Sequence, residues 1–200
     1  MADQFEDFRA FLPKYLSTAD QQDLFAELSQ FPPNIDKRLY TDRLRGEPVI
    51  FQGDGLTDLP VTNLPNPRIG NARHVMVMSN SCDVDLRNRR YLGPRLMYCP
   101  IIAFADYTES IRPVSGKLPV DHIEHVRRQK VSSLFYLPQY GDLPDSVALL
   151  DRFVNFDLRA LDIEHMTRTR TFTLSNYGFY YFLFKLSIHL TRMREGISRS

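Results

Sequence analysis

Two short apolar runs near the middle of the chain predict a pair of buried strands. Residues 75–78 read Val-Met-Val-Met, and residues 96–102 read Leu-Met-Tyr-Cys-Pro-Ile-Ile. Short continuous apolar runs are typical of strands that are buried on both faces, and their β-branched and aromatic members favour strand over helix. The polar segment between the runs, residues 79–95, would then join two central strands, where proteins often display binding groups.

The segments on either side predict further strands separated by turns. Strand composition is found at residues 48–51, 132–137, 147–150, 153–156 and 171–174. Residues 59–70 are rich in proline, glycine and asparagine, so we expect a long irregular loop there.

Helical patterns occur near the N-terminus and at one internal position. Residues 5–16 and 18–31 predict two short helices, and Thr18 with Gln21 forms a capping box at the start of the second. Asp121 is expected to cap a short helix that follows a polar insertion at residues 106–116.

The last apolar segment predicts a helix over residues 176–195, capped by Ser175. At a turn of about 100° per residue, this helix carries two apolar stripes on nearly opposite faces. The first stripe contains Phe179, Phe182, Leu183, Leu186 and Leu190, and the second contains Tyr177, Tyr181, Phe184 and Ile188. We expect the first to face the sheet. The second needs the N-terminal helices, a protein partner or a second copy of the chain, which would dock on Tyr181, Phe184 and Ile188.

Together these elements predict an α+β fold with one main domain. A chain of 200 residues suits one domain with additions better than two independent domains. We therefore expect an N-terminal helical extension, residues 1–39, and a domain of residues 40–200 that ends in the long C-terminal helix.

Composition narrows the cellular setting but not the ligand. The formal net charge of +1 gives no global attraction to nucleic acid or to a membrane surface. The first residues lack the pattern of a secretory signal, and the apolar run 177–190 contains Lys185 and His189 and is too short to span a bilayer. With two cysteines in the whole chain, we expect reduced thiols, a cytoplasmic protein and no membrane contact.

Cys82 and Asp83 are candidate site residues in the polar segment. The arginines that follow would lower the pKa of a Cys82 thiolate and make it a nucleophile. The adjacent carboxylate opposes this, so we favour a structural Cys82 beside an Asp83 that caps the turn. Cys82, Cys99, His122 and His125 lack the paired spacing of a zinc site, and we expect neither a metal nor another cofactor.

The strongest basic cluster lies in the same segment. It consists of Arg87, Arg89, Arg90 and Arg95, with Tyr91 and Tyr98 nearby. Guanidinium groups interleaved with aromatic rings suit single-stranded nucleic acid. The alternative is a solvated loop in which these arginines pair with nearby aspartates, and the sequence supports both interpretations.

Several short motifs follow one another in the order of a known family. They are Gly53-Asp54-Gly55, the run 73–79 followed by Asn80, Cys99-Pro100-Ile101, the run 146–151 followed by 152–159, and Thr173-Leu174-Ser175 before the last helix. In this order the chain resembles the MazF/PemK-like toxins over residues 43–192, with an insertion near 106–130. The resemblance implies an SH3-like antiparallel β-barrel, a dimer, and cleavage of single-stranded RNA.

The resemblance also implies site residues. It places the catalytic arginine at Arg68 or Arg73, makes Ser79 a further catalytic candidate, and puts Ile102 where these toxins commonly carry a threonine that assists cleavage. Ser79, Cys82 and Asp83 are also similar to a Ser-x-x-Cys-Asp signature of uncharacterised bacterial proteins.

Two functional hypotheses result. In the first, the chain binds RNA and is either a lapsed nuclease or a metal-independent endoribonuclease, in which a 2′-hydroxyl attacks the phosphate held by Arg68 or Arg73. In the second, it is a non-enzymatic interaction component of a toxin–antitoxin or phage-defence system. The arginine cluster favours the first hypothesis, and Ile102 favours the second.

Overall fold

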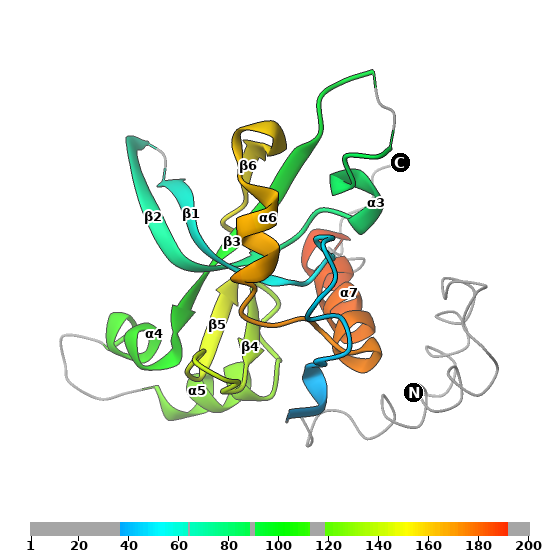
Figure 1. The fold of residues 1–200 in the computed structure, drawn as a ribbon. Coiled ribbons are helices and arrows are strands. Elements are labelled where there is room, and N and C mark those ends of the chain that lie inside the picture. Colours follow the sequence, from blue (N-terminus) through cyan, green and yellow to red (C-terminus); the bar gives the residue numbers. More distant parts are fainter. Residues whose placement is uncertain (1–36, 64, 89–90, 113–118, 192–200) are drawn as a thin grey trace, which may run out of the picture. The chain divides into compact units, whose positions relative to one another are not determined.

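The chain divides into two units, residues 1–34 and 35–200. The computed structural model describes residues 37–63, 65–88, 91–112 and 119–191, all of which belong to the second unit (Figure 1). The two predicted N-terminal helices, Arg89 and Arg90 lie outside the described residues, as does the predicted end of the last helix.

A six-stranded antiparallel sheet forms the centre of the second unit (Figure 1). Its strands are β1 (Gly55–Asn63), β2 (Asn66–Val77), β3 (Arg95–Ala103), β4 (Leu134–Leu137), β5 (Ser146–Leu149) and β6 (Val154–Asp157). The order is β1-β2-β3-β5-β4, and β6 pairs with β3. The predicted α+β class and both central strands are confirmed. Among the described strands, β1, β4 and β6 each pair with a single neighbour, so the pairing does not close into a ring.

The irregular loop predicted at residues 59–70 is wrong, because β1 and β2 form a long hairpin there. Pro60 pairs with Asn71 within its ladder. Proline is tolerated on an edge strand, where its missing N–H group can face away from the ladder, and β1 is such a strand. The carbonyl of Pro60 also accepts a hydrogen bond from the Tyr98 hydroxyl, which ties the hairpin to β3.

The strand predicted at residues 48–51 is also absent from the described sheet. The carbonyls in this segment are bonded to a side chain instead, since the Arg170 guanidinium donates to the carbonyl oxygens of Glu47 and Val49. Arg170 Nε also lies 3.2 Å from the carboxylate of Asp54, and both side chains are buried. One arginine thus holds the segment that enters β1.

Short helices connect and flank the strands. They are η1 (Lys37–Leu39), α3 (Ser81–Val84), α4 (Phe104–Ser110), α5 (Val120–Arg127), η2 (Leu158–Ala160) and α6 (Ile163–Arg168). The internal helix is confirmed as α5, but its N-cap is Pro119 rather than Asp121. Helix α4 occupies the start of the predicted polar insertion. The predicted closing strand forms only isolated bridges, Gly55 with Phe172 and Tyr40 with Leu174.

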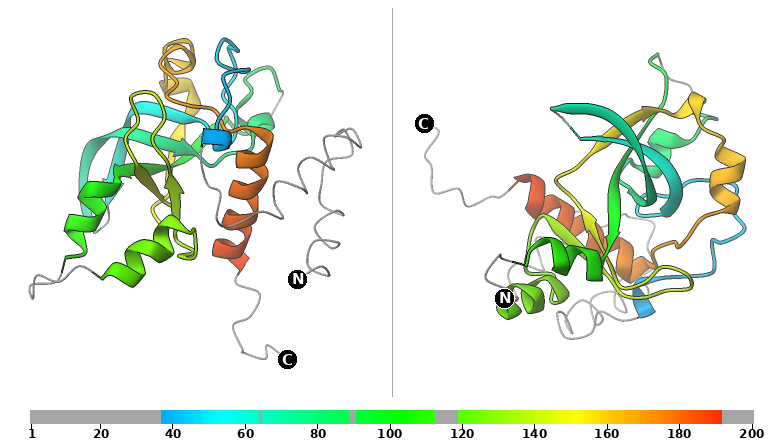
Figure 2. Two further views of the ribbon diagram at one scale, coloured as in Figure 1. Left: turned by 90° about the horizontal axis from the view of Figure 1, so that it is seen from below. Right: turned by 90° about the vertical axis from the view of Figure 1, so that its left-hand side faces the viewer.

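The C-terminal helix α7 (Asn176–Thr191) packs beside the sheet, and both views of Figure 2 show it next to β4. Ser175 caps it as predicted, since its hydroxyl accepts from Gly178 N at 3.1 Å. The ring of Phe135 on β4 contacts Tyr181 and Phe182, with centroids 5.9 and 5.6 Å apart. Tyr181 is therefore part of the core and not of an open surface.

The far end of α7 keeps apolar surface in contact with solvent. Phe184 and Ile188 are each 43% exposed, and Leu190 is 59% exposed. Among the described residues, no helix is long and apolar enough to cross a membrane.

Candidate functional site

Pro100 marks the place where β3 changes its neighbour. On one edge, β3 pairs with β6 through Arg95–Tyr98 and with β5 through Ile101–Ala103. Cys99 and Pro100 stand between these ladders, and proline has no N–H group to donate. The facing chain leaves the sheet here and forms a turn, in which Arg152 N donates to Leu149 O at 3.0 Å. This excursion presents residues 151–153 to solvent.

The excursion forms one wall of an open groove of about 1080 Å³. The opposite wall is the second half of the hairpin, residues 68–74, and the floor is the stretch of β3 from Pro100 to Ala103. The start of α4 and the loop before β5 complete the lining through Asp106, Asp142 and Pro144. The groove therefore follows from one proline in a central strand and from one long hairpin.

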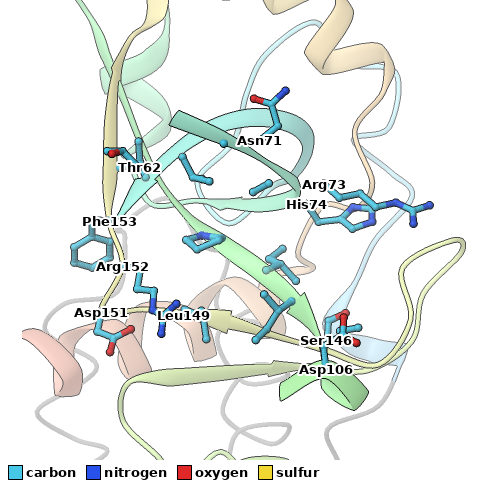
Figure 3. Close-up of a pocket in the computed structure, with 18 of the residues that line it drawn as sticks. Thr62, Asn71, Arg73, His74, Asp106, Ser146, Leu149, Asp151, Arg152 and Phe153 are labelled. Carbon is cyan, nitrogen blue, oxygen red and sulfur yellow. The ribbon is translucent and has the colours of Figure 1, made fainter. Parts of the chain in front are cut away.

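Both walls of the groove carry charged side chains. The hairpin wall carries Arg68, Arg73 and His74, whereas the acidic side chains Asp106, Asp142 and Asp151 come from the other elements. Figure 3 shows Arg73 and His74 together at one end of the groove and Arg152 with Phe153 at the other. The groove therefore offers cations from both walls, because Arg152 lies on the excursion wall, and carboxylate acceptors on the side opposite the hairpin.

The groove also offers apolar surface. Phe153 is 37% exposed and Ile69 is 78% exposed, and both line it. Exposed apolar side chains beside charged ones are common where proteins bind ligands with mixed polarity. An aromatic ring such as that of Phe153 provides a face for a planar group.

Among the described residues, His74 is the one histidine that lines the groove. It is half-buried on β2, opposite Ile101 of β3 and Thr57 of β1. Burial, and then the neighbouring Arg73 guanidinium, lower the pKa of His74 below its ordinary value of 6.5, while the Asp58 carboxylate acts in the opposite direction. These surroundings favour the neutral imidazole.

The structure brings together three positions that the family resemblance had singled out. Arg68 and Arg73 lie on the hairpin wall, and Ile102 lies on the floor between the walls. Both arginines have exposed side chains.

Ser79, the third catalytic candidate, does not line the groove. Its hydroxyl accepts a hydrogen bond from Met97 N at 2.7 Å and lies 3.4 Å from Arg95 O, to which it donates. The side chain is only 8% exposed. In this geometry Ser79 joins the end of β2 to the start of β3, which is a structural task.

Cys82 and Asp83 belong to the short helix α3, also outside the groove lining. Asn80 caps this helix, and its side-chain oxygen accepts from Cys82 N at 2.9 Å. Asn88 holds the other end of the loop by donating to Cys82 O at 2.8 Å. The Cys82 thiol is exposed, whereas Cys99 is buried beside Met78, and burial raises the pKa of the Cys99 thiol.

Two of the four clustered arginines lie in the described part of the chain, and both have protein partners. Arg87 binds Asp85 through two nitrogens at 2.8–3.1 Å and holds the pKa of that carboxyl at about 2. Arg95 donates to the side chain and to the carbonyl of Asn155, the latter at 3.2 Å. The pairing of Arg87 matches the alternative in which this loop is a solvated surface.

Of the two histidines weighed as metal ligands, His122 and His125, the first connects two helices. His122 Nε2 lies 2.6 Å from the Tyr107 hydroxyl, which links α5 to α4. Among the described residues, no three His, Cys, Asp or Glu side chains come together in a way that would hold a metal ion.

Sequence reasoning assigned no role to His74, Asp151, Arg152 or Phe153. The available signal was a proline inside a predicted central strand, because proline there interrupts a ladder and displaces the facing chain. No known protein-family model matches the chain, and a search of curated proteins finds no relative of it.

Proposed function

We propose that this protein binds single-stranded RNA in the groove between the β1–β2 hairpin and the excursion that follows β5. The observation that carries the proposal is the placement of Arg68 and Arg73 on one wall of an open groove whose other wall presents Phe153. Arginine is well suited to phosphate because its guanidinium is planar and permanently charged. Unpaired bases stack on aromatic rings without regard to sequence.

The two arginines on the hairpin wall and the carboxylates opposite them fit one orientation of a bound strand. Phosphates would follow the hairpin wall, and the bases would turn toward Phe153 and the carboxylates on the opposite side. Carboxylates accept hydrogen bonds from the amino groups of bases. In an RNA duplex the base faces are stacked and the amino groups lie in a deep, narrow major groove that side chains do not reach, so we expect preference for single strands.

A relation to the MazF/PemK-like toxins is part of the proposal. In its support, Pro100 and Ile101 of the motif Cys99-Pro100-Ile101 line the groove floor, and both expected arginine positions and Ile102 line the same groove. The change of partner along β3, from β6 to β5, is compatible with a sheet of the SH3-like type.

The proposal is tested by fluorescence anisotropy with a labelled single-stranded RNA of mixed sequence. The double variant Arg68→Ala, Arg73→Ala should bind more weakly, and its salt slope should fall by about 0.7 for each lost phosphate contact. A matched double variant, Arg87→Ala with Arg95→Ala, changes the same charge outside the groove lining. Weakening by the second variant alone would place the interface on the 79–95 loop and refute the groove.

A second candidate is the non-enzymatic interaction component. It is favoured by Ile102, which has no group for acid–base chemistry, and by the apolar surface at the end of α7. Absence of RNA binding at low salt, together with self-association through α7, would support this candidate over the first.

A further inference from the structure

We propose that the excursion after β5 gives the groove a subsite for guanine, in which the Asp151 carboxylate and the Arg152 guanidinium bind the edge of a base stacked on Phe153. This inference rests on the proposed function and deepens it. Stacking on an aromatic ring does not distinguish the bases, whereas contacts to the edge of a base do.

The sheet anchors the excursion at both ends. Residues 151–153 are consecutive, exposed and part of the groove lining, and Figure 3 shows them at one end of the groove. The chain before them is paired with β3 up to Ala148, and the chain after them is paired with β3 again from Val154. The hydrogen bond from Arg152 N to Leu149 O, at 3.0 Å, closes the turn between the two ladders. The three side chains are therefore held on a rigid support.

The two charged groups of this turn are open to a ligand. Within the residues that the structure describes, neither side chain of the 151–152 pair forms a hydrogen bond or an ion pair. Two other loops of the chain contain an aspartate and an arginine close in sequence, and there the charges pair with each other. Arg87 lies 2.8 Å from Asp85, and Arg159 lies 2.6 Å from Asp157. In the groove the same two kinds of group remain available for a base.

Guanine is the base whose edge matches this pair of groups. It presents the acceptors N7 and O6 and, next to them, the donors N1–H and N2–H₂. Arginine donates to N7 and O6 through two N–H groups, which is the commonest specific contact to a base. A carboxylate has two acceptor oxygens and no donor, so it can accept from N1–H and N2–H₂ together.

The other three bases satisfy the pair only in part. Adenine and cytosine offer a carboxylate one amino group beside a ring nitrogen that is itself an acceptor, and uracil offers one N–H between two carbonyl oxygens. Consecutive Cα atoms are about 3.8 Å apart, so neighbouring residues such as Asp151 and Arg152 suit two groups along one base edge. Phe153 follows directly in the chain and offers a ring, 37% exposed, on which the base can stack.

The assay is fluorescence anisotropy with a short labelled single strand of uridines in which one central base is varied. We expect the strand with guanine to bind at least about fivefold more tightly than the all-uridine strand, the lower end of what a bidentate base contact provides. Hypoxanthine differs from guanine only in lacking the N2 amino group, and it should lose most of this advantage. 7-Deazaguanine, which lacks the N7 acceptor, should lose part of it.

Two variants assign the contacts to residues. In Asp151→Asn the strands with guanine and with hypoxanthine should bind within about twofold of each other, because the amide cannot accept from both donors. In Arg152→Gln the difference between guanine and 7-deazaguanine should disappear. Asp121→Asn makes the same change of charge on α5, outside the groove lining, and should keep the full preference for guanine. Since Asp151 is exposed, its variant should keep the melting temperature of the wild type, which separates lost recognition from misfolding.

The outcomes separate this inference from the proposed function. Binding of all strands with equal affinity, a preference for adenine or cytosine, or a guanine preference that survives Asp151→Asn overturns the guanine subsite and leaves RNA binding in the groove intact. Failure to bind any of the strands overturns both. A guanine preference that needs the N2 amino group and Asp151, and that Asp121→Asn leaves unchanged, supports the assignment.

Discussion

The buried guanidinium of Arg170 shows how a single side chain organises this domain. Arg170 is 7% exposed and donates to the carbonyls of Leu44, Glu47 and Val49 while it faces the buried carboxylate of Asp54. Burial raises the pKa of Asp54 to about 6, and the Arg170 charge opposes that rise. Removing one partner of a buried ion pair leaves the other charge uncompensated. The pair of Arg170 and Asp54 therefore serves the stability of the fold.

Lys185 on α7 is a different case, because its only described acceptor is the carbonyl of Gln129. Burial lowers the pKa of Lys185 from 10.5 to about 7. Between these values the unfolded chain holds a proton that the folded chain has released, so the free energy of unfolding should rise with pH over this window. The stabilisation is lost as the pH falls through 7.

We therefore predict that Lys185→Met flattens this rise and stabilises the protein at pH 7 and below. The gain should be about 1–3 kcal/mol, since the lost hydrogen bond to Gln129 offsets part of the desolvation that is relieved. Urea denaturation at several pH values between 7 and 10 measures it. Lys130→Met, at an exposed position, should leave the slope unchanged. An unaltered slope in Lys185→Met would show that the amine is charged in the folded state.

At the scale of elements, the start of α7 depends on a close backbone approach. A Cβ atom at Gly178 would lie 2.1 Å from the carbonyl oxygen of Leu39. The same oxygen accepts a hydrogen bond from Ser175 N at 2.9 Å, so η1 and the first turn of α7 form one joint. Only a residue without a side chain permits this contact.

This close contact predicts that replacing Gly178 by alanine destabilises the protein. Helix propensity alone would predict the opposite. Alanine is favoured over glycine inside a helix by about 1 kcal/mol. In Gly178→Ala the clash with Leu39 should exceed this gain, because overpacking typically costs about 1–3 kcal/mol. We expect net destabilisation in thermal unfolding, whereas Gly46→Ala, with open space around its Cβ position, should be close to neutral. A more stable Gly178→Ala variant would contradict the joint.

The same scale shows what could be predicted from the sequence. Continuous apolar runs were sufficient for β3, β4 and α7, since burial on both faces leaves a direct pattern. The β1–β2 hairpin was missed because Pro60 and Gly70 have the composition of a loop, and only the position of β1 at the sheet edge makes Pro60 acceptable. The groove was missed in part because the excursion at Asp151 is caused by Pro100, some fifty residues earlier in the chain.

At the scale of the whole molecule, Ile188 and Leu190 give the end of α7 a partly exposed apolar face. Phe184 and Ile188 are one helical turn apart and so share a face. Each retains 43% of its surface, and Leu190 retains more. Each fully buried apolar side chain of this size contributes about 1.5–3 kcal/mol, so covering this surface is a substantial source of affinity. The sequence had also assigned a partner surface to this helix, although Tyr181 is now seen to belong to the core.

We predict that the chain self-associates through this end of α7. Ile188→Glu should shift the protein to a monomer at concentrations where the wild type is dimeric, because association would have to bury an unpaired carboxylate. The melting temperature of the monomer should change little, since the position is already partly exposed. Val120→Glu places the same charge at an exposed apolar position of α5 and should not alter the assembly. Light scattering coupled to size exclusion, over a range of protein concentrations, distinguishes these cases. A wild type that is monomeric throughout, or a dimer that persists in Ile188→Glu, would exclude this end of α7 as the self-association surface.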